Sequence, residues 1–217
     1  MNRFLSIACL VLPVWVANAQ EAVTTSPELP KTVFGIKGGV NVSSLSASIN
    51  SESRAKAGLA LGIYVKVPVG PRGFFRPELY YSNQGQKDNY IYPYGHGGPS
   101  IGSTTTSLHY INVPLLLEFG RKVSFQVGPQ VGILVKGTEK GTVASMKVDD
   151  DLKDVMTKAD VALVAGVGFS PGGHFNCGAR YNYGFSNIYK PANGGNSNND
   201  LPTVQNRVFH FYVAYSF

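Results

Sequence analysis

Apolar and polar positions alternate through residues 123–136, VSFQVGPQVGILVK. One face of this segment is entirely apolar, with Val123, Phe125, Val127, Pro129, Val131, Ile133 and Val135. The other face is mostly polar or small, with Ser124, Gln126, Gly128, Gln130, Gly132, Leu134 and Lys136. A period of two predicts a β-strand with one apolar face. The segment is about twice as long as a usual strand in a soluble domain.

Seven other segments carry the same period of two. They cover residues 33–42, 57–67, 74–83, 108–119, 160–169, 174–187 and 206–217. In each of them the apolar side chains stay on one face, and Gly, Asn, Tyr or charged residues occupy the other. The chain is therefore predicted to form eight strands of ten to fourteen residues.

The connections between these strands alternate in length. Long connections, rich in Ser, Gly, Asn and Thr, cover residues 43–56, 84–107, 137–159 and 188–205. Short connections, built on Pro, Gly and basic residues, cover residues 68–73, 120–122 and 170–173. Long loops on one side and short periplasmic turns on the other are typical of outer-membrane barrels. The pattern predicts an all-β protein, an eight-stranded antiparallel up-and-down transmembrane β-barrel over residues 33–217, with both termini on the periplasmic side.

The alternation alone leaves open which face is inside. A secreted soluble β-sandwich or a lipocalin-like barrel would bury the apolar face, whereas strands that cross a membrane must form a closed barrel with that face in lipid. Aromatic residues near both ends of the strands favour the membrane barrel, because they are enriched at the two membrane interfaces. They are Phe34, Phe75, Phe119, Phe125, Phe169, Phe175 and Phe217 near the short turns, and Tyr81, Tyr183, Phe185 and Phe209 near the long loops.

The first nineteen residues have the composition of a secretory signal peptide. Arg3 precedes an apolar run from Phe4 to Val16, and Ala17-Asn18-Ala19 supplies a small-x-small cleavage site before Gln20. Residues 20–32 are expected to be a flexible periplasmic segment before the barrel domain. This organisation predicts export through a cleaved signal peptide to the bacterial outer membrane.

Three prolines conflict with the predicted strands. Pro77, Pro114 and Pro129 lie inside them, and a closed barrel has no edge strand to accommodate a missing hydrogen-bond donor. The alternation passes through all three without a shift, so a locally weakened strand pairing is expected.

The formal net charge of +6 raises the possibility of nucleic-acid binding. The long loops together are close to neutral, however, so they offer no basic platform for nucleic acid. The excess lies in the lumen and at short turns that contain Arg72, Arg121 and Lys122, where cations hold a barrel against anionic lipid. Outer-membrane lipid is the expected partner, nucleic acid is not, and a monomer is expected.

Charged residues on the lumen face suggest an ion-pair cluster. Adjacent strands place Lys66, Arg76, Glu78 and Glu118 near their periplasmic ends, Lys136 and Asp160 are expected opposite each other at outer strand ends, and Arg180 is a further inward cation. An eight-stranded barrel has a lumen that side chains can fill. A structural ion-pair network is favoured, and a gated path or small-ligand site in a narrow transport barrel is the alternative.

The long loops contain two further candidates. Residues 84–107 include Tyr90, Tyr92, Tyr94 and His96 among glycines, which suits recognition of an extracellular protein or glycan. The equally weighted alternative is that the flanking strands extend and the tyrosines pack there. Residues 147–158 carry Asp149, Asp150, Asp151 and Asp154, but without the spaced ligands and glycine of a calcium loop, so a short solvated helix is predicted.

An outer-membrane enzyme is the rival from another class. It requires a histidine near a nucleophile or acid, and the candidates are His96 and His109 with Ser100, Ser103 or Asp88. No nucleophile elbow, metal-ligand pair or phosphate loop occurs elsewhere. The prediction is that the protein is not an enzyme and uses no cofactor or metal.

Five segments together resemble the PorT-like outer-membrane β-barrel family of Bacteroidota type. In order they are FGIKGGVNVSSLS (34–46), TTTSLHYINVPLLLEFG (104–120), VGPQVGILVKG (127–137), DVALVAGVGFS (160–170) and ARYNYGFSNI (179–188). The resemblance implies an eight-stranded outer-membrane barrel and little about activity. The namesake member is linked to a protein secretion system, so a secretion-system accessory role is an expectation by analogy alone. The residues themselves favour a structural or interaction role through the extracellular loops.

Overall fold

The computed structural model describes residues 31–46, 52–92, 100–143, 146–190 and 203–217. The strands in these ranges are β1 Val33–Leu45, β2 Glu52–Pro68, β3 Gly73–Tyr92, β4 Ser100–Gly120, β5 Val123–Val143, β6 Met146–Asp151, β7 Ala159–Gly172, β8 Phe175–Gly184 and β9 Asn206–Ser216. No helix in the described part of the chain is long and apolar enough to cross a membrane.

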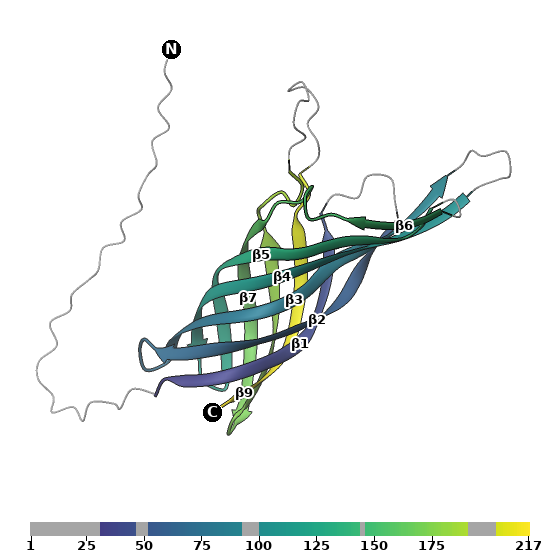
Figure 1. Cartoon of the computed structure of the whole chain (residues 1–217). Helices are drawn as coiled ribbons and strands as arrows, with labels where there is room; N and C mark the ends of the chain where they lie inside the picture. Colours follow the sequence, from purple (N-terminus) through teal and green to yellow (C-terminus); the bar gives the residue numbers. More distant parts are fainter. Residues whose placement is uncertain (1–30, 47–51, 93–99, 144–145, 191–202) are drawn as a thin grey trace, which may run out of the picture.

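Eight of the nine strands close into an antiparallel barrel (Figure 1). The pairing order is β4-β3-β2-β1-β9-β8-β7-β5, and β4 pairs with β5 to complete the circle. The first strand meets the last, with Gly35 opposite Ser216. The prediction of an eight-stranded up-and-down β-barrel is confirmed.

One end of the barrel contains the short connections. Residues 69–72, 121–122 and 173–174 join strand pairs there, and the beginning of β1 and the end of β9 lie at the same end (Figure 1). Gly120 and Gly172 have φ angles of 121° and 130°, which glycine adopts without steric cost beside such tight turns. Loop lengths alternate between the two ends as the sequence predicts.

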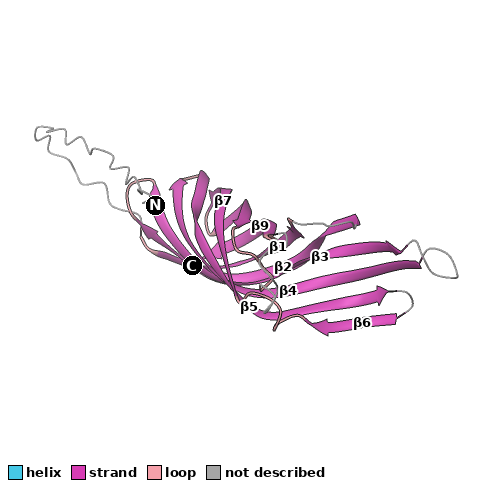
Figure 2. Ribbon diagram, turned by 90° about the horizontal axis from the view of Figure 1, so that it is seen from above, coloured by secondary structure: helices cyan, strands magenta, loops and turns pink. Residues whose placement is uncertain are grey.

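At the other end of the barrel the strands extend to different lengths, and several of them are longer than predicted. β3 and β4 stay paired as far as Tyr92 opposite Ser100, and β4 and β5 as far as Ser103 opposite Thr142. β6 pairs with β5 alone. The paired ends of β2, β3, β4, β5 and β6 form a sheet that projects beyond the barrel (Figure 2), called the extension below.

The helix predicted over residues 147–158 is wrong. Residues 146–151 form β6, with Met146 opposite Val143 and Asp151 opposite Thr138. β5 offers an unpaired edge above the barrel, and pairing with it satisfies backbone groups that a short isolated helix would leave to solvent. Only one helical turn follows, where the Met156 amide donates to the Leu152 carbonyl oxygen.

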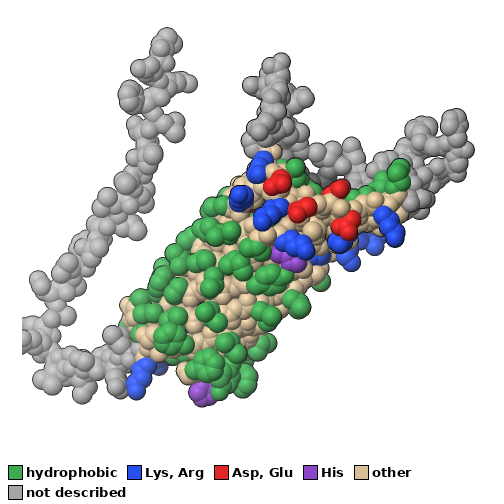
Figure 3. Space-filling model, in the orientation of Figure 1, with side chains coloured by type: hydrophobic (Ala, Val, Ile, Leu, Met, Phe, Trp, Pro, Cys, Tyr) green, Lys and Arg blue, Asp and Glu red, His purple; other side chains and the backbone are tan. Residues whose placement is uncertain are grey.

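Side chains on the barrel strands alternate between an exposed apolar face and a buried polar face. On β5, Phe125 and Val131 are 64% and 45% exposed, whereas Gln126 and Gln130 are 2% and 5% exposed. Figure 3 shows apolar side chains over the barrel wall and charged side chains gathered towards the extension. A soluble fold would bury its apolar face, so the arrangement fits a wall surrounded by hydrocarbon.

The three prolines interrupt the strand pairing without changing its register. Between β3 and β4 the pairing passes from Pro77 opposite Leu115 directly to Tyr80 opposite Asn112, and the residues between them are unpaired. A similar gap follows Pro114 opposite Gln130 in the β4–β5 pair. The ladder is therefore weakened locally, as expected from the missing proline donors.

Candidate functional site in the barrel interior

Glu78 is the centre of a buried charge cluster inside the barrel. Arg180 Nη1 and Nη2 donate to its two carboxylate oxygens at 2.8 and 2.7 Å, and Lys37 Nζ donates at 2.5 Å. Arg76 Nε lies 2.8 Å from Oε1. The four side chains come from β1, β3 and β8 and are almost completely buried. One carboxylate is therefore surrounded by three cations.

Arg76 links this centre to a second carboxylate, Glu118. Arg76 Nη1 donates to Glu118 Oε2 at 3.0 Å, and Lys66 Nζ donates to Oε1 at 2.7 Å. Gln126 bridges the two halves, because it donates to Glu118 at 3.1 Å and accepts from Arg180 Nε at 2.7 Å. Charge-assisted bonds of this kind are short and strong, and their networks rigidify the groups they join.

Aromatic rings lie against the cations of the cluster, which outnumber its carboxylates. The Arg76 guanidinium lies 4.1 Å from the Tyr64 ring centroid, Arg180 lies 4.6 Å from that of Tyr212, and Lys37 Nζ lies 3.9 Å from that of Tyr80. The faces of these rings carry negative potential, which stabilises a desolvated cation. The rings also fill the lumen between the charged groups.

A layer of neutral hydrogen bonds lies beside the charges. Tyr80 donates from its hydroxyl to Gln130 Oε1 at 2.7 Å, and Gln130 donates to Asn112 Oδ1 at 3.2 Å. His210 Nδ1 lies 2.6 Å from Asn41 Oδ1. All five side chains are buried. Asn182 of β8 also donates to the Tyr80 hydroxyl at 3.3 Å, so polar contacts cross the lumen from β8 to β3.

An apolar plug closes the lumen on the long-loop side. It consists of the buried side chains Leu45, Leu108, Tyr110, Leu134, Met156 and Ile188. The first four come from barrel strands, and the last two come from the connections that follow β6 and β8. The Thr157 amide donates to the Ile188 carbonyl oxygen at 2.8 Å, which joins these two connections. The plug and the charge cluster are thus two separate groups of buried side chains inside the barrel.

The structure brings together five of the predicted lumen residues, Lys66, Arg76, Glu78, Glu118 and Arg180, in one connected cluster. Asp160 is buried elsewhere and accepts a bond from Asn206 Nδ2 at 2.8 Å. The expected facing of Lys136 and Asp160 is wrong. β5 contains a bulge, since His109 pairs with Lys136 and Tyr110 with Leu134, and the extra residue turns Lys136 to the exposed outer surface.

Sequence reasoning missed several members of the site. Lys37, Tyr80, Gln126 and Tyr212 lie at lumen-facing positions of the predicted strands, so their parity was a usable signal. The plug also had a signal, because Leu108, Tyr110 and Leu134 are large apolar residues on the polar face. Nothing in the local sequence indicates that Met156 and Ile188 meet them.

The candidates in the long connections have separate locations. Tyr90 and Tyr92 belong to β3, so the strand does extend through them, but their side chains lie outside the described residues, as do Tyr94 and His96. His109 is half-buried beside the Tyr81 hydroxyl, whereas Asp88 is buried against Gln86. Among the hydrogen bonds of the described residues, none joins these two candidates for an enzyme site.

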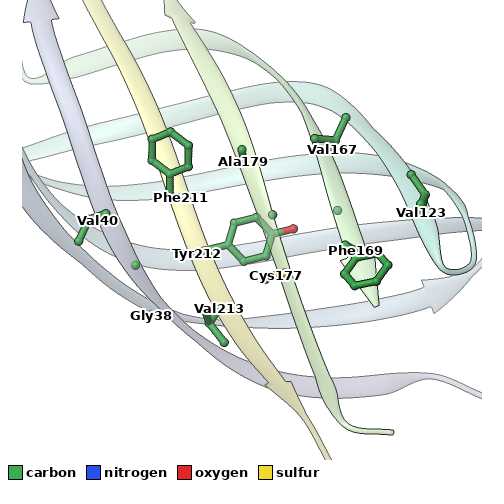
Figure 4. Close-up of a pocket in the computed structure, with 13 residues that line it drawn as sticks. Gly38, Val40, Val123, Val167, Phe169, Cys177, Ala179, Phe211, Tyr212 and Val213 are labelled. Atoms are coloured by element: carbon green, nitrogen blue, oxygen red, sulfur yellow. The ribbon is translucent and has the colours of Figure 1, made fainter. Parts of the chain in front are cut away.

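A groove on the outer wall belongs to the lipid-facing surface. It has a volume of about 640 Å³ and crosses β1, β9, β8 and β7 (Figure 4). Gly38 and Cys177 both lie opposite Val213, so short side chains flank that position and leave the wall hollow. Its lining is almost entirely apolar, which suits acyl chains and gives a polar ligand nothing to bind.

Comparisons with known proteins agree with this architecture. The chain matches the outer membrane protein beta-barrel domain family over residues 18–190. No curated protein matches it in sequence. The crystal structure of Neisserial surface protein A (NspA) is similar over 87% of this chain and 100% of that chain, at 12% identity and a TM-score of 0.50.

A further solved structure has the same coverage. It is Ail, the attachment invasion locus protein of Yersinia pestis, crystallised with the heparin analogue sucrose octasulfate. It covers 87% of this chain and 100% of that chain, at 13% identity and a TM-score of 0.49. The likeness to NspA shows the fold, and the family match spans most of the sequence. The chain therefore belongs to the outer membrane protein β-barrel domain family.

Proposed function

We propose that the protein is a closed outer-membrane barrel with a structural or interaction role, which acts through its extracellular surface and passes no solute through its lumen. The observation that supports this proposal is the presence of two separate groups of buried side chains inside the barrel. One is the Glu78 cluster and the other is the apolar plug. Eight strands leave little interior space beyond that of the side chains.

The extension is the surface that this proposal assigns to interaction. Its outer face carries a cross-strand row in which Arg54, Lys87, Thr105, Lys140 and Asp149 are successive partners. Strand pairing holds this polar surface in a fixed shape above the apolar wall, so little conformational entropy is lost when a partner binds. An extracellular protein or glycan is the partner class, and Tyr90, Tyr92, Tyr94 and His96 at the far end are proposed to contribute.

Conductance across planar bilayers tests the closed lumen. The purified wild-type protein should show no steady open channel at either voltage polarity. Stable, ion-selective conductance would instead favour the alternative, a narrow transport barrel with a gated polar path.

Photo-crosslinking on intact cells tests the interaction role. A photoreactive residue at Thr105 should give a discrete adduct, whereas one at Val131, on the lipid-facing wall, should give lipid adducts only. Equal protein adducts from both positions, or none from Thr105, would contradict an extracellular partner. Enrichment of secretion-machinery components at Thr105 would support the PorT-like analogy.

Export is proposed to remove residues 1–19, so the protein isolated from outer membranes should begin at Gln20, as mass spectrometry of its N-terminal peptide can establish. The protein is proposed to be a monomer without catalytic activity, and the detergent-solubilised protein should hydrolyse neither lipid nor peptide substrates.

A further inference from the structure

A cavity of about 410 Å³ opens at the short-turn end of the lumen. Four cationic side chains line it, Lys31, Lys66, Arg76 and Arg121, and its lining among the described residues includes no Asp or Glu. By the loop-length rule this end faces the periplasm. The cavity is thus a basic vestibule on the periplasmic side.

The inner wall of the vestibule is preorganised. Arg76 is 2% exposed, its Nε forms an ion pair with Glu78, and its Nη1 donates to Glu118, while Nε and Nη2 make no hydrogen bond within the described part of the chain. The Tyr64 ring lies against the guanidinium, and the Tyr64 hydroxyl lies 2.7 Å from Ser216 Oγ. The charges are therefore fixed by packing before any ligand arrives.

Positive charge exceeds negative charge around this space. Glu118 contacts both Lys66 and Arg76, and Glu78, which also contacts Arg76, is shared with Lys37 and Arg180, so each carboxylate faces more than one cation. Lys31 and Arg121 add two more cations at the rim. A dianion would compensate this surplus better than a monoanion, since both of its charges find partners.

We propose that this vestibule binds a phosphate group, free or as a small monoester, that reaches it from the periplasm. Arg and Lys side chains match phosphate oxygens in geometry and charge. The volume lies in the range of small-molecule sites, and Phe74 and Tyr64 give an ester group apolar walls. The cavity ends at the Glu78 cluster, so it serves binding and not passage. The site does not depend on the extracellular role, and either can fail alone.

Calorimetric titration of the refolded mature chain in zwitterionic detergent tests the site, with inorganic phosphate, phenyl phosphate and acetate as probes at constant ionic strength. The two phosphate probes should bind saturably and acetate should not. Arg121→Gln should weaken phosphate binding about tenfold, the usual loss for one charge-assisted contact. Lys122→Gln removes the neighbouring cation of the same turn, which does not line the cavity, and should leave affinity unchanged.

Heat-modifiable migration on a gel shows that each variant has refolded. Equal loss of binding in both variants, or phosphate binding no tighter than acetate binding, would overturn the site.

Phosphatidylglycerol vesicles form the second arm of the experiment. Adsorption to these vesicles without any binding of soluble phosphate would assign the cations to lipid headgroups and would also overturn the proposal.

Discussion

At the scale of single residues, the face of the strand on which a position lies decides which substitutions that position tolerates. Val131 and Gln130 are neighbours on β5, yet one is exposed on the apolar wall and the other is buried in the lumen. A polar group on the wall loses its hydration when it enters lipid, which costs free energy, whereas a polar group in the lumen finds hydrogen-bond partners.

Val131→Arg should lower the free energy of unfolding by about 2–4 kcal/mol, the cost of a cation near the middle of the lipid-facing wall. Thr105→Glu is the control, because Thr105 lies on the outer face of the extension between Lys87 and Lys140, where these cations and water accommodate an added charge. It should change stability by less than about 0.5 kcal/mol. Urea unfolding in lipid vesicles measures both. Equal costs would show that the wall around Val131 does not face hydrocarbon.

Glu78→Gln should destabilise the barrel by about 3–5 kcal/mol, since it leaves Lys37, Arg76 and Arg180 buried without their shared counter-charge. Asp149→Asn is the matched control. Asp149 pairs with Lys140 at 3.1 Å, but the two side chains are 68% and 64% exposed, so the change should stay below about 1 kcal/mol. The same vesicle assay compares them, and similar losses would deny the cluster a structural role.

At the scale of elements, the plug and the barrel strands differ in how many backbone hydrogen bonds hold them in place. Met156 and Ile188 come from irregular connections, with few backbone bonds to the barrel. The strands are held by continuous ladders. The plug is therefore expected to open locally without unfolding of the barrel.

Met156→Ala should remove about 2–5 kcal/mol of packing from the plug. The Thr157 amide, bonded to the Ile188 carbonyl oxygen, should then exchange with solvent deuterium at least tenfold faster. Val155→Ala is the control, because Val155 is 52% exposed and contributes little to the plug. If both variants leave Thr157 exchange unchanged, the plug does not depend on the burial of Met156.

At the scale of the whole molecule, the two ends of the barrel differ in build. The short turns lie at the same end of the barrel as the start of β1 and the end of β9, and the extension projects from the opposite end (Figures 1 and 2). The extension is polar and suits the extracellular side, whereas the short turns suit the periplasmic side.

In a Cys177→Ala background, Lys140→Cys should react with a membrane-impermeant maleimide on intact cells. Arg72→Cys should react only after the outer membrane is permeabilised, because Arg72 lies in a short turn expected on the periplasmic side. Both positions are exposed, so location and not burial decides the labelling. Labelling of Arg72→Cys on intact cells would invert the topology.

The barrel fold could be predicted from local pattern. The apolar parity of eight segments identifies the strands and their outer face, because a strand's two faces are encoded by alternate positions. Short and long connections then identify the two ends. Residues such as Arg76, Glu78 and Glu118 could be placed in the lumen from parity alone, since every strand of a closed barrel turns the same kind of face inward.

Only the tertiary structure decided which lumen residues meet. Arg180 and Glu78 are 102 positions apart, and their contact depends on how the strands are staggered around the barrel. A single bulged residue in β5 moved Lys136 outward, because one inserted position reverses parity beyond it. The sequence left the extension of β3 and β4 as one of two equal alternatives and did not predict β6, because strands above the membrane have no lipid-facing side, so polar residues occupy both faces and the period of two disappears. Sequence determined the wall of this barrel, and three-dimensional packing determined what fills and closes it.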